Sequence, residues 1–186
     1  MTAETGHEAR HEARHEARHE ARHEVRHEVR HEVRHEAGHE VRSAVPADRG
    51  AVERTVLAAY GHWAEVIGMR PLPMDADYGR LIREGHVFVV GPADGLIVLV
   101  PEDEVLLVEN VAVRPSSQGR GVGRSLLAFA ERRARLLGLP ALRLYTNEKM
   151  TSNISLYTSL GYRETARELH AGRHTVHMRK DLPPPA

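Results

Sequence analysis

The chain has 186 residues, 26 basic and 26 acidic side chains and no cysteine, so its formal net charge at neutral pH is zero. The lack of cysteine excludes disulfides and thiol catalysis, and the balanced charge gives no general attraction to nucleic acid or to a membrane surface. No apolar run approaches the roughly 18 residues of a membrane-spanning helix, and residues 1–10 lack the apolar stretch of a secretory signal. We therefore expect a soluble, cytoplasmic protein.

The N-terminal part is a tetrapeptide repeat. Residues 7–42 are nine units of the type His-Glu-Ala/Val-Arg, one of which ends in Gly38. A four-residue period advances about 40° per unit around an α-helix, so the small apolar side chains form no continuous stripe. Like charges also recur at i,i+4, which disfavours a helix. We expect residues 1–38 to form a low-complexity, disordered tail.

Each overlap of two repeat units reproduces the zinc-protease pattern His-Glu-x-x-His. That pattern needs a stable helix, a third ligand and a substrate cleft before it binds a catalytic metal. One repeated unit generates every match, so we predict no designed metal site. Nine imidazoles still allow adventitious binding of Zn or Ni.

The rest of the chain has the patterning of one domain, over residues 39–182, followed by a short tail at 183–186. Asp48 stands where a helix N-cap is expected, the second helix is expected to start near Asp75, and Leu57 is among the apolar positions of the first helix. The predicted elements, in chain order, are a strand at 39–45, helices at 51–67 and 74–83, β-rich runs at 86–90, 95–100 and 105–114, a helix at 121–137, a strand at 141–145, a helix at 151–160, and a hairpin of 162–169 with 173–179.

A glycine-rich loop follows the third β-rich run. Gly119, Gly121 and Gly123 alternate with larger residues just before a predicted helix start. Glycine permits unusual dihedrals and the close approach of a ligand, and a helix start offers unpaired amides to an anion. The loop lacks the lysine of a P-loop, and Arg124 stands where a dinucleotide-binding loop needs its third glycine. We predict a phosphate or pyrophosphate site.

The sequence here resembles the GNAT superfamily of N-acetyltransferases. Gln118, Gly121 and Gly123 match the Gln-x-x-Gly-x-Gly loop that binds the pyrophosphate of acetyl-CoA in that family. Downstream, Asn153 and the run Leu156-Tyr157-x-x-x-Gly161-Tyr162 match the helix that follows. The resemblance covers roughly residues 40–182. It implies an α/β (α+β) fold with a mixed, mostly antiparallel sheet of six to seven strands flanked by about four helices.

The resemblance also implies how acetyl-CoA, acting as co-substrate, would bind. The amides of Val111 and Val113 would hold the carbonyl and the pantetheine arm, the loop amides would cradle the pyrophosphate, and Asn153 would bond a pantetheine amide. Arg120 and Arg124 would add charge, with solvated surface residues as the alternative. The full set of residues expected to contact the cofactor is Val111, Ala112, Val113, Gln118, Gly119, Arg120, Gly121, Val122, Gly123, Arg124 and Asn153.

Two residues are catalytic candidates by the same resemblance. Tyr157 would supply a proton to the leaving thiolate, or else is an ordinary packing residue. Glu109, a carboxylate in an otherwise apolar strand, would act as general base or would only orient the substrate at the rim. Asn110 beside it is expected to shape a strand bulge. Asn153 has a helix cap as its alternative role.

Acetyl transfer to an amine needs neither a metal nor a covalent nucleophile, so we expect no metal cofactor. The acceptor is expected to be a primary amine of a small molecule or of a peptide or protein terminus, with Trp63, residues 69–78 and 170–174 around it, and with Asp75 and Asp77 available to attract a cation. No specific nucleic-acid or membrane partner is expected, and the protein is expected to be a monomer or a homodimer. Two alternatives remain: a non-catalytic acyl-CoA sensor of the same fold, and a His-rich metal-binding protein.

Overall fold

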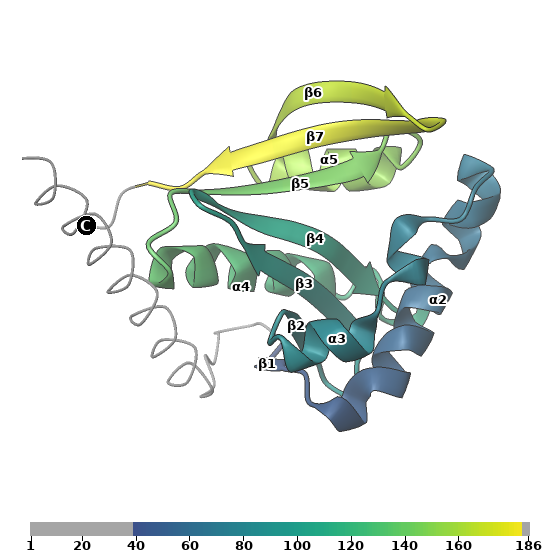
Figure 1. Cartoon of the computed structure of the whole chain (residues 1–186), viewed down its shortest axis with the longest axis vertical. Helices are drawn as coiled ribbons and strands as arrows, with labels where there is room; N and C mark the ends of the chain where they lie inside the picture. The colour runs from purple at the N-terminus through teal and green to yellow at the C-terminus, as the bar shows by residue number, and fades with distance from the viewer. Residues whose placement is uncertain (1–38, 184–186) are drawn as a thin grey trace, which may run out of the picture. The chain divides into compact units, whose positions relative to one another are not determined.

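A computed structural model describes residues 39–183, which form one folded unit (Figure 1). Short 3₁₀ turns aside, the order of elements is the predicted one. The elements are β1 (Val41–Ser43), α2 (Arg49–Ile67), α3 (Tyr78–Arg83), β2 (Val87–Val90), β3 (Gly95–Pro101), β4 (Val105–Val113), α4 (Val122–Leu136), β5 (Ala141–Asn147), α5 (Thr151–Ser159), β6 (Arg163–His170) and β7 (Arg173–Asp181). None of the helices within residues 39–183 has the length and apolar character needed to cross a membrane.

The strands form a single seven-stranded sheet with the order β1-β2-β3-β4-β5-β7-β6. Every neighbouring pair is antiparallel except β4 and β5, which run parallel because α4 connects them as a crossover. The β6–β7 hairpin turns through Ala171 and Gly172, both with positive φ of 48° and 74°, the backbone of a tight hairpin turn. The predicted mixed, mostly antiparallel sheet is confirmed.

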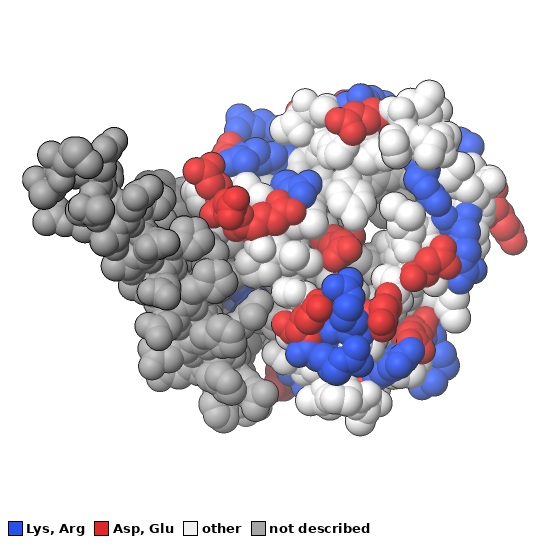
Figure 2. Space-filling model, in the orientation of Figure 1, with Lys and Arg blue, Asp and Glu red and all other residues white. Residues whose placement is uncertain are grey.

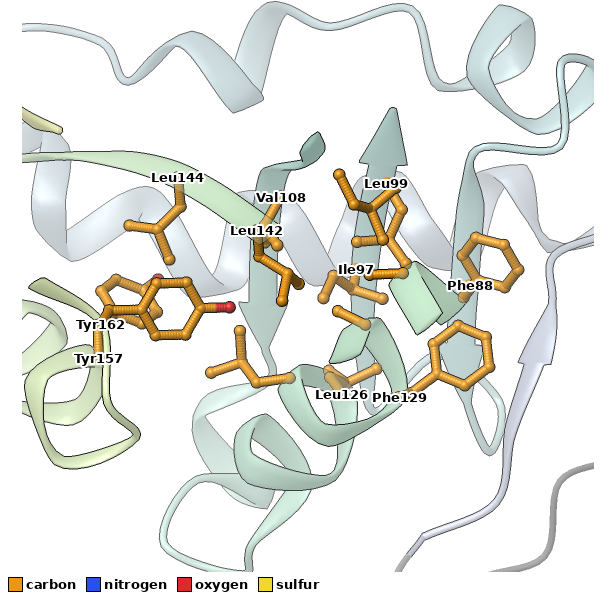
Figure 3. Packing of buried hydrophobic residues seen from close by; sticks show 14 of the residues in the cluster. Phe88, Ile97, Leu99, Val108, Leu126, Phe129, Leu142, Leu144, Tyr157 and Tyr162 are labelled. Atoms are coloured by element: carbon orange, nitrogen blue, oxygen red, sulfur yellow. The ribbon is translucent and has the colours of Figure 1, made fainter. Parts of the chain in front are cut away.

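Helices cover both faces of the sheet, which explains why β2 is buried along its whole length. Phe88 and Val90 point to the face covered by α4 and α5, while Val87 and Val89 point to the face covered by α2 and α3. The larger of the two cores lies between the sheet and α4, where Phe88 and Phe129 pack with ring centroids 4.9 Å apart (Figure 3).

The parallel pair β4–β5 opens into a wedge. The two strands pair only from Val105 with Ala141 to Val108 with Leu144. Beyond that point β4 stays with β3 as far as Val113, and β5 stays with β7 as far as Asn147. Figure 1 shows the two strands diverging toward α2. The wedge leaves a gap in the middle of the sheet, bounded by backbone on both sides.

A bulge in β4 marks the point where the wedge begins. Val98 pairs with Asn110 and Leu99 pairs with Val108, so Glu109 is the extra residue of the strand. An extra residue bends the strand and increases its twist, which is why β4 leaves β5 here. The bulge expected at Asn110 is therefore present, with Glu109 at its centre.

Two local predictions were wrong. The second helix begins at Tyr78, not near Asp75: Asp77 is its N-cap and accepts from Arg80 N–H over 2.9 Å. Residues 72–75 form a 3₁₀ turn instead, and the Asp75 carboxylate pairs with Arg70 over 2.6 Å. Leu57 is 47% exposed because Val52, Thr55 and Val56 already fill the buried face of α2.

Candidate active site

The loop between β4 and α4 presents bare backbone at two positions. Gly119 and Gly121 have φ of 73° and 84°, a region that favours glycine, and a Cβ on either would meet no atom within 4 Å. Gly121 is the N-cap of α4, and Ser125 N–H donates to its carbonyl over 3.0 Å. The amides of residues 122–124 precede that bond and have no helical acceptor, so they suit an anion.

A cleft of about 370 Å³ begins at this loop and extends between α2, β4 and α5. All but one of the residues expected to contact the cofactor line it: Val111, Ala112, Val113, Gln118, Gly119, Gly121, Val122, Gly123, Arg124 and Asn153. Arg120 is the exception, an exposed side chain outside the lining. Trp63, expected at the acceptor site, lines this cleft instead.

The backbone of β4 faces the wedge at two of the predicted positions. The carbonyl of Val111 accepts from the Tyr60 hydroxyl over 3.3 Å, and that of Val113 accepts from the Gln118 side-chain amide over 3.1 Å. Because N–H and C=O of one strand residue point to the same side, the amides of Val111 and Val113 also point away from β3. No β5 residue pairs with either one.

A second, smaller pocket of about 90 Å³ occupies the wedge itself. Glu109 lines it, together with Tyr145 of β5, Arg173 of β7 and apolar residues of the segment after α2. The cleft and the pocket meet, because they share the lining residues Tyr60, Val111, Met150, Asn153 and Tyr157. The acid expected as a base and the loop expected to bind phosphate therefore belong to two adjoining cavities.

Tyr157 stands where the cavities meet. It is 8% exposed and packs against Tyr162, with ring centroids 5.9 Å apart, as Figure 3 shows at the α5 end of the core. Burial raises the pKa of Tyr157 to about 12, so the phenol stays protonated at neutral pH. Both roles considered for Tyr157 fit the geometry: the ring packs in the core and also borders both cavities.

Glu109 is half-buried and has no ion-pair partner. No Lys, Arg or His between residues 39 and 183 forms a salt bridge with it. Burial raises the pKa of Tyr145, and the charge of Glu109 raises it further, which places the carboxylate near that phenol. An unneutralised carboxylate in a small pocket attracts a cation.

Asn110 is a residue whose role sequence analysis missed. Its side chain is buried, accepts from the Tyr60 hydroxyl over 2.6 Å and donates to the Tyr78 hydroxyl over 2.9 Å. Tyr78 in turn donates to the carbonyl of Pro73 over 2.8 Å. This chain of hydrogen bonds ties α2, α3 and the segment between them to β4, and so fixes one wall of the pocket.

Several expectations about the surroundings need correction. Asp75 and Asp77 line neither cavity, because one pairs with Arg70 and the other caps α3. Asn153 is not a helix cap, since Met150 occupies the N-cap of α5. Within residues 39–183 no group of three or more His, Cys, Asp or Glu side chains is placed to hold a metal. The His-Glu-x-x-His matches before residue 39 lie outside the described residues.

Comparison with known proteins relates part of this chain to an acetyltransferase family. Residues 83–164 match the family model described as an acetyltransferase (GNAT) domain. A mycothiol acetyltransferase of Thermomonospora curvata is 36% identical over 86 residues, which are 46% of this chain and 26% of that protein. The chain thus spans about a quarter of that relative's length, and the match concerns a part of it.

Solved structures share the fold at low sequence identity. An N-acetyltransferase from Thermoplasma acidophilum in complex with coenzyme A has a TM-score of 0.64 and 15% identity, over 77% of this chain and 98% of that one. A GNAT-family acetyltransferase from Listeria monocytogenes has a TM-score of 0.63 and 17% identity, over 82% of this chain and 100% of that one. Residues 83–164 thus match a GNAT acetyltransferase domain, and the solved acetyltransferases share the fold of the whole domain.

Proposed function

We propose that the protein is an acetyl-CoA-dependent N-acetyltransferase that joins acetyl-CoA and a primary amine in a ternary complex. The observation that carries this proposal is the meeting of the two cavities at Val111, Asn153 and Tyr157. A cofactor in the cleft and an amine in the pocket would be held within reach of each other, which is the main requirement of this reaction. The coenzyme A complex of the Thermoplasma relative supports the choice of cofactor.

The chemistry follows from the groups at the junction. The amides of residues 122–124 hold the pyrophosphate, and the Val111 amide donates to the thioester carbonyl oxygen as negative charge develops on it. Glu109, directly or through a water, removes a proton from the ammonium group of the acceptor. The free amine attacks the carbonyl carbon, the C–N bond forms, and the C–S bond breaks with the electron pair going to sulfur, while the nitrogen loses its second proton to water to give the neutral amide.

Tyr157 stabilises the departing thiolate by donating a hydrogen bond to it. The raised pKa of Tyr157, about 12, lies above that of a free thiol near ~8.5. Complete proton transfer to sulfur is therefore uphill, whereas a hydrogen bond from the neutral phenol is available throughout the neutral range. The proton that finally reaches the thiol comes from solvent or from the acceptor through Glu109.

The test is cofactor binding followed by turnover. We expect calorimetry to show coenzyme A binding that is lost in Gly123→Val, because this glycine lines the cleft at the start of α4 and a Cβ there meets only the Val113 side chain, at 3.8 Å. Gly121→Val is a poorer test, since φ of 84° strains any side chain. Gly61→Val is the matched control: Gly61 is also helical, and a Cβ there meets nothing within 4 Å.

The outcomes separate the candidate functions. Coenzyme A binding with transfer of acetyl to amines supports the transferase. Tight binding without transfer to any amine supports a non-catalytic acyl-CoA sensor. A folded Gly123→Val protein with unchanged affinity for coenzyme A contradicts the placement of the cofactor.

A further inference from the structure

The pocket in the wedge contains two charged side chains of opposite sign. Of the residues that line it, only Glu109 and Arg173 are charged; the others are apolar or neutral polar. They come from β4 and β7, two strands that lie on opposite sides of β5 in the sheet. Neither charge neutralises the other, because no salt bridge joins them.

Arg173 is anchored to the backbone and has no counter-ion in the described part of the chain. It begins β7 at the tip of the hairpin, and its Nη1 donates to the carbonyl of Arg70 over 3.1 Å. No Asp or Glu of residues 39–183 pairs with it; the nearby Glu148 pairs with His174 over 3.2 Å. A guanidinium has five N–H donors in a planar fork that matches a carboxylate, and a single backbone contact leaves most of them available.

The register of the strands places the two charges at different depths. Glu109 follows the last β4–β5 pair, Val108 with Leu144, so it lies where the wedge closes. Arg173 lies beyond Thr175, which pairs with Asn147 at the far end of β5. A molecule in the pocket therefore meets a carboxylate where the wedge closes and a cation toward the far end of β5.

The pocket is also small, and hydrogen bonds join the segments around it. Lys149 Nζ donates to the carbonyls of Val66 and Ile67 over 3.3 and 3.2 Å, at the C-terminal end of α2, where a cation is favoured. Together with the Arg173–Arg70 bond, this contact draws the loop before α5 and the tip of the β6–β7 hairpin against the end of α2. At about 90 Å³ the pocket is less than a quarter of the volume of the neighbouring cleft, about 370 Å³, which suits an acceptor that is small beside the cofactor.

We propose that the acceptor is a small free amino acid, whose amine lies at Glu109 and whose carboxylate binds Arg173. This inference rests on the transferase function proposed above and specifies its substrate class. A zwitterion satisfies both unpaired charges at once, whereas a simple amine leaves Arg173 without a partner. A peptide N-terminus has an amide where the free carboxylate would be, so it also leaves Arg173 without an anion.

The first experiment compares acceptors that differ only in the carboxylate. The kcat/KM of glycine, alanine, β-alanine and γ-aminobutyrate is each compared with that of its amide. It is also compared with that of a dipeptide in which the same amino acid is the N-terminal residue. We expect at least one of these amino acids to exceed its amide and its dipeptide in kcat/KM by about tenfold or more, as for the loss of one charge-assisted contact. Amides or dipeptides that match or exceed all the acids would overturn the inference.

The second experiment tests whether the carboxylate of the amino acid binds Arg173. Arg173→Gln should raise KM about tenfold for the preferred amino acid and leave KM for its amide unchanged, and Arg173→Lys should restore part of the loss. His174→Gln, at the next position but outside the pocket lining, is the control for disturbance of the hairpin tip. An equal loss on acid and amide would show that Arg173 acts only through its bond to Arg70, and would overturn the proposal.

A binding measurement keeps the two proposals distinguishable. The preferred amino acid is titrated into the protein already saturated with coenzyme A, and Glu109→Gln and Arg173→Gln should each weaken that binding. Acetylation of amines without any preference for carboxylates removes the substrate assignment but leaves the transferase intact. Coenzyme A binding without acetylation of any acceptor contradicts the transferase itself.

Discussion

At the scale of single residues, Tyr157 and Tyr162 offer a matched pair. Both rings are buried in the same core, 5.9 Å apart (Figure 3). Only Tyr157 lines the two cavities. The Tyr162 hydroxyl is buried and has no hydrogen-bond partner among the described residues. Replacing each tyrosine by phenylalanine therefore distinguishes a hydroxyl that takes part in the reaction from a ring that only packs.

Tyr157→Phe should lower turnover by roughly 10²-fold and leave acetyl-CoA affinity nearly unchanged, because it removes a donor used when the thiolate leaves. Tyr162→Phe should keep full turnover and equal or higher stability, since it removes a buried hydroxyl that bonds to nothing. Steady-state kinetics, calorimetry with coenzyme A and urea unfolding check both variants. Full activity in Tyr157→Phe would leave that ring with a packing role only.

At the scale of elements, the position of α4 depends on Gly95 at the start of β3. A Cβ there would lie 2.6 Å from a methyl carbon of Val122 and 3.3 Å from the carbonyl of Ala112. The glycine thus lets the first turn of α4, whose amides are proposed to bind the pyrophosphate, lie close against the sheet. Neither contact is visible in the local pattern of the sequence, because Gly95 and Val122 belong to elements separated by β4.

Gly95→Ala should destabilise the protein by about 1–3 kcal/mol, the usual cost of overpacking, and should also weaken coenzyme A binding by shifting the start of α4. Adding Val122→Ala should recover part of both losses. Urea midpoints and calorimetric affinities for the single and double variants form a double-mutant cycle. If the effects of the two substitutions on stability and on coenzyme A affinity simply add, the contact of position 95 with Val122 does not control the loop.

Local signals explain which elements could be predicted. The start of α4, the hairpin turn and the strand runs follow from glycine positions and apolar periodicity within a few residues. The wedge pocket could not be found that way, because Glu109 and Arg173 are brought to it by the order of strands in the sheet. The sequence predicts that the second helix starts near Asp75, whereas α3 starts after Asp77, because residues 72–75 first form a 3₁₀ turn that the local pattern does not reveal.

At the scale of the whole molecule, charged side chains of both signs surround a largely uncharged, hollowed centre on the face shown in Figure 2.

The five tyrosines of the chain all have raised pKa values, with burial as the largest cause at each. In the unfolded chain each would ionise near pH ~10. The unfolded state therefore loses its phenolic protons at a lower pH than the folded state does.

Below pH ~10 the phenols are protonated in both states, so they should not make the free energy of unfolding depend on pH. Above pH ~10 the free energy of unfolding should fall. For Tyr157 this fall continues until the pH reaches its folded-state pKa of about 12. Urea midpoints measured from pH 8 to about 11.5, together with tyrosinate absorbance, check this. We expect the absorbance to rise in step with unfolding. Titration of the tyrosines near their ordinary pKa in a protein that stays folded would contradict the assignment of burial as the cause.

The last prediction concerns the repeat before the domain. Residues 7–42 carry nine Glu, eight Arg and nine His, so their net charge changes from −1 to +8 when all the histidines are protonated. This change occurs just below neutrality, where imidazole titrates.

The domain begins with β1 at Val41, and the His39 amide donates to Ser125 of α4 over 3.4 Å. A variant that lacks residues 1–38 keeps these contacts and should match the full chain in melting temperature and in turnover at pH 7.5. It should differ only below about pH 6.5, where the repeat's positive charge gives the full chain a weak, salt-sensitive affinity for polyanions. Loss of most of the turnover at pH 7.5, with an unchanged melting temperature, would instead show that the repeat takes part in the reaction.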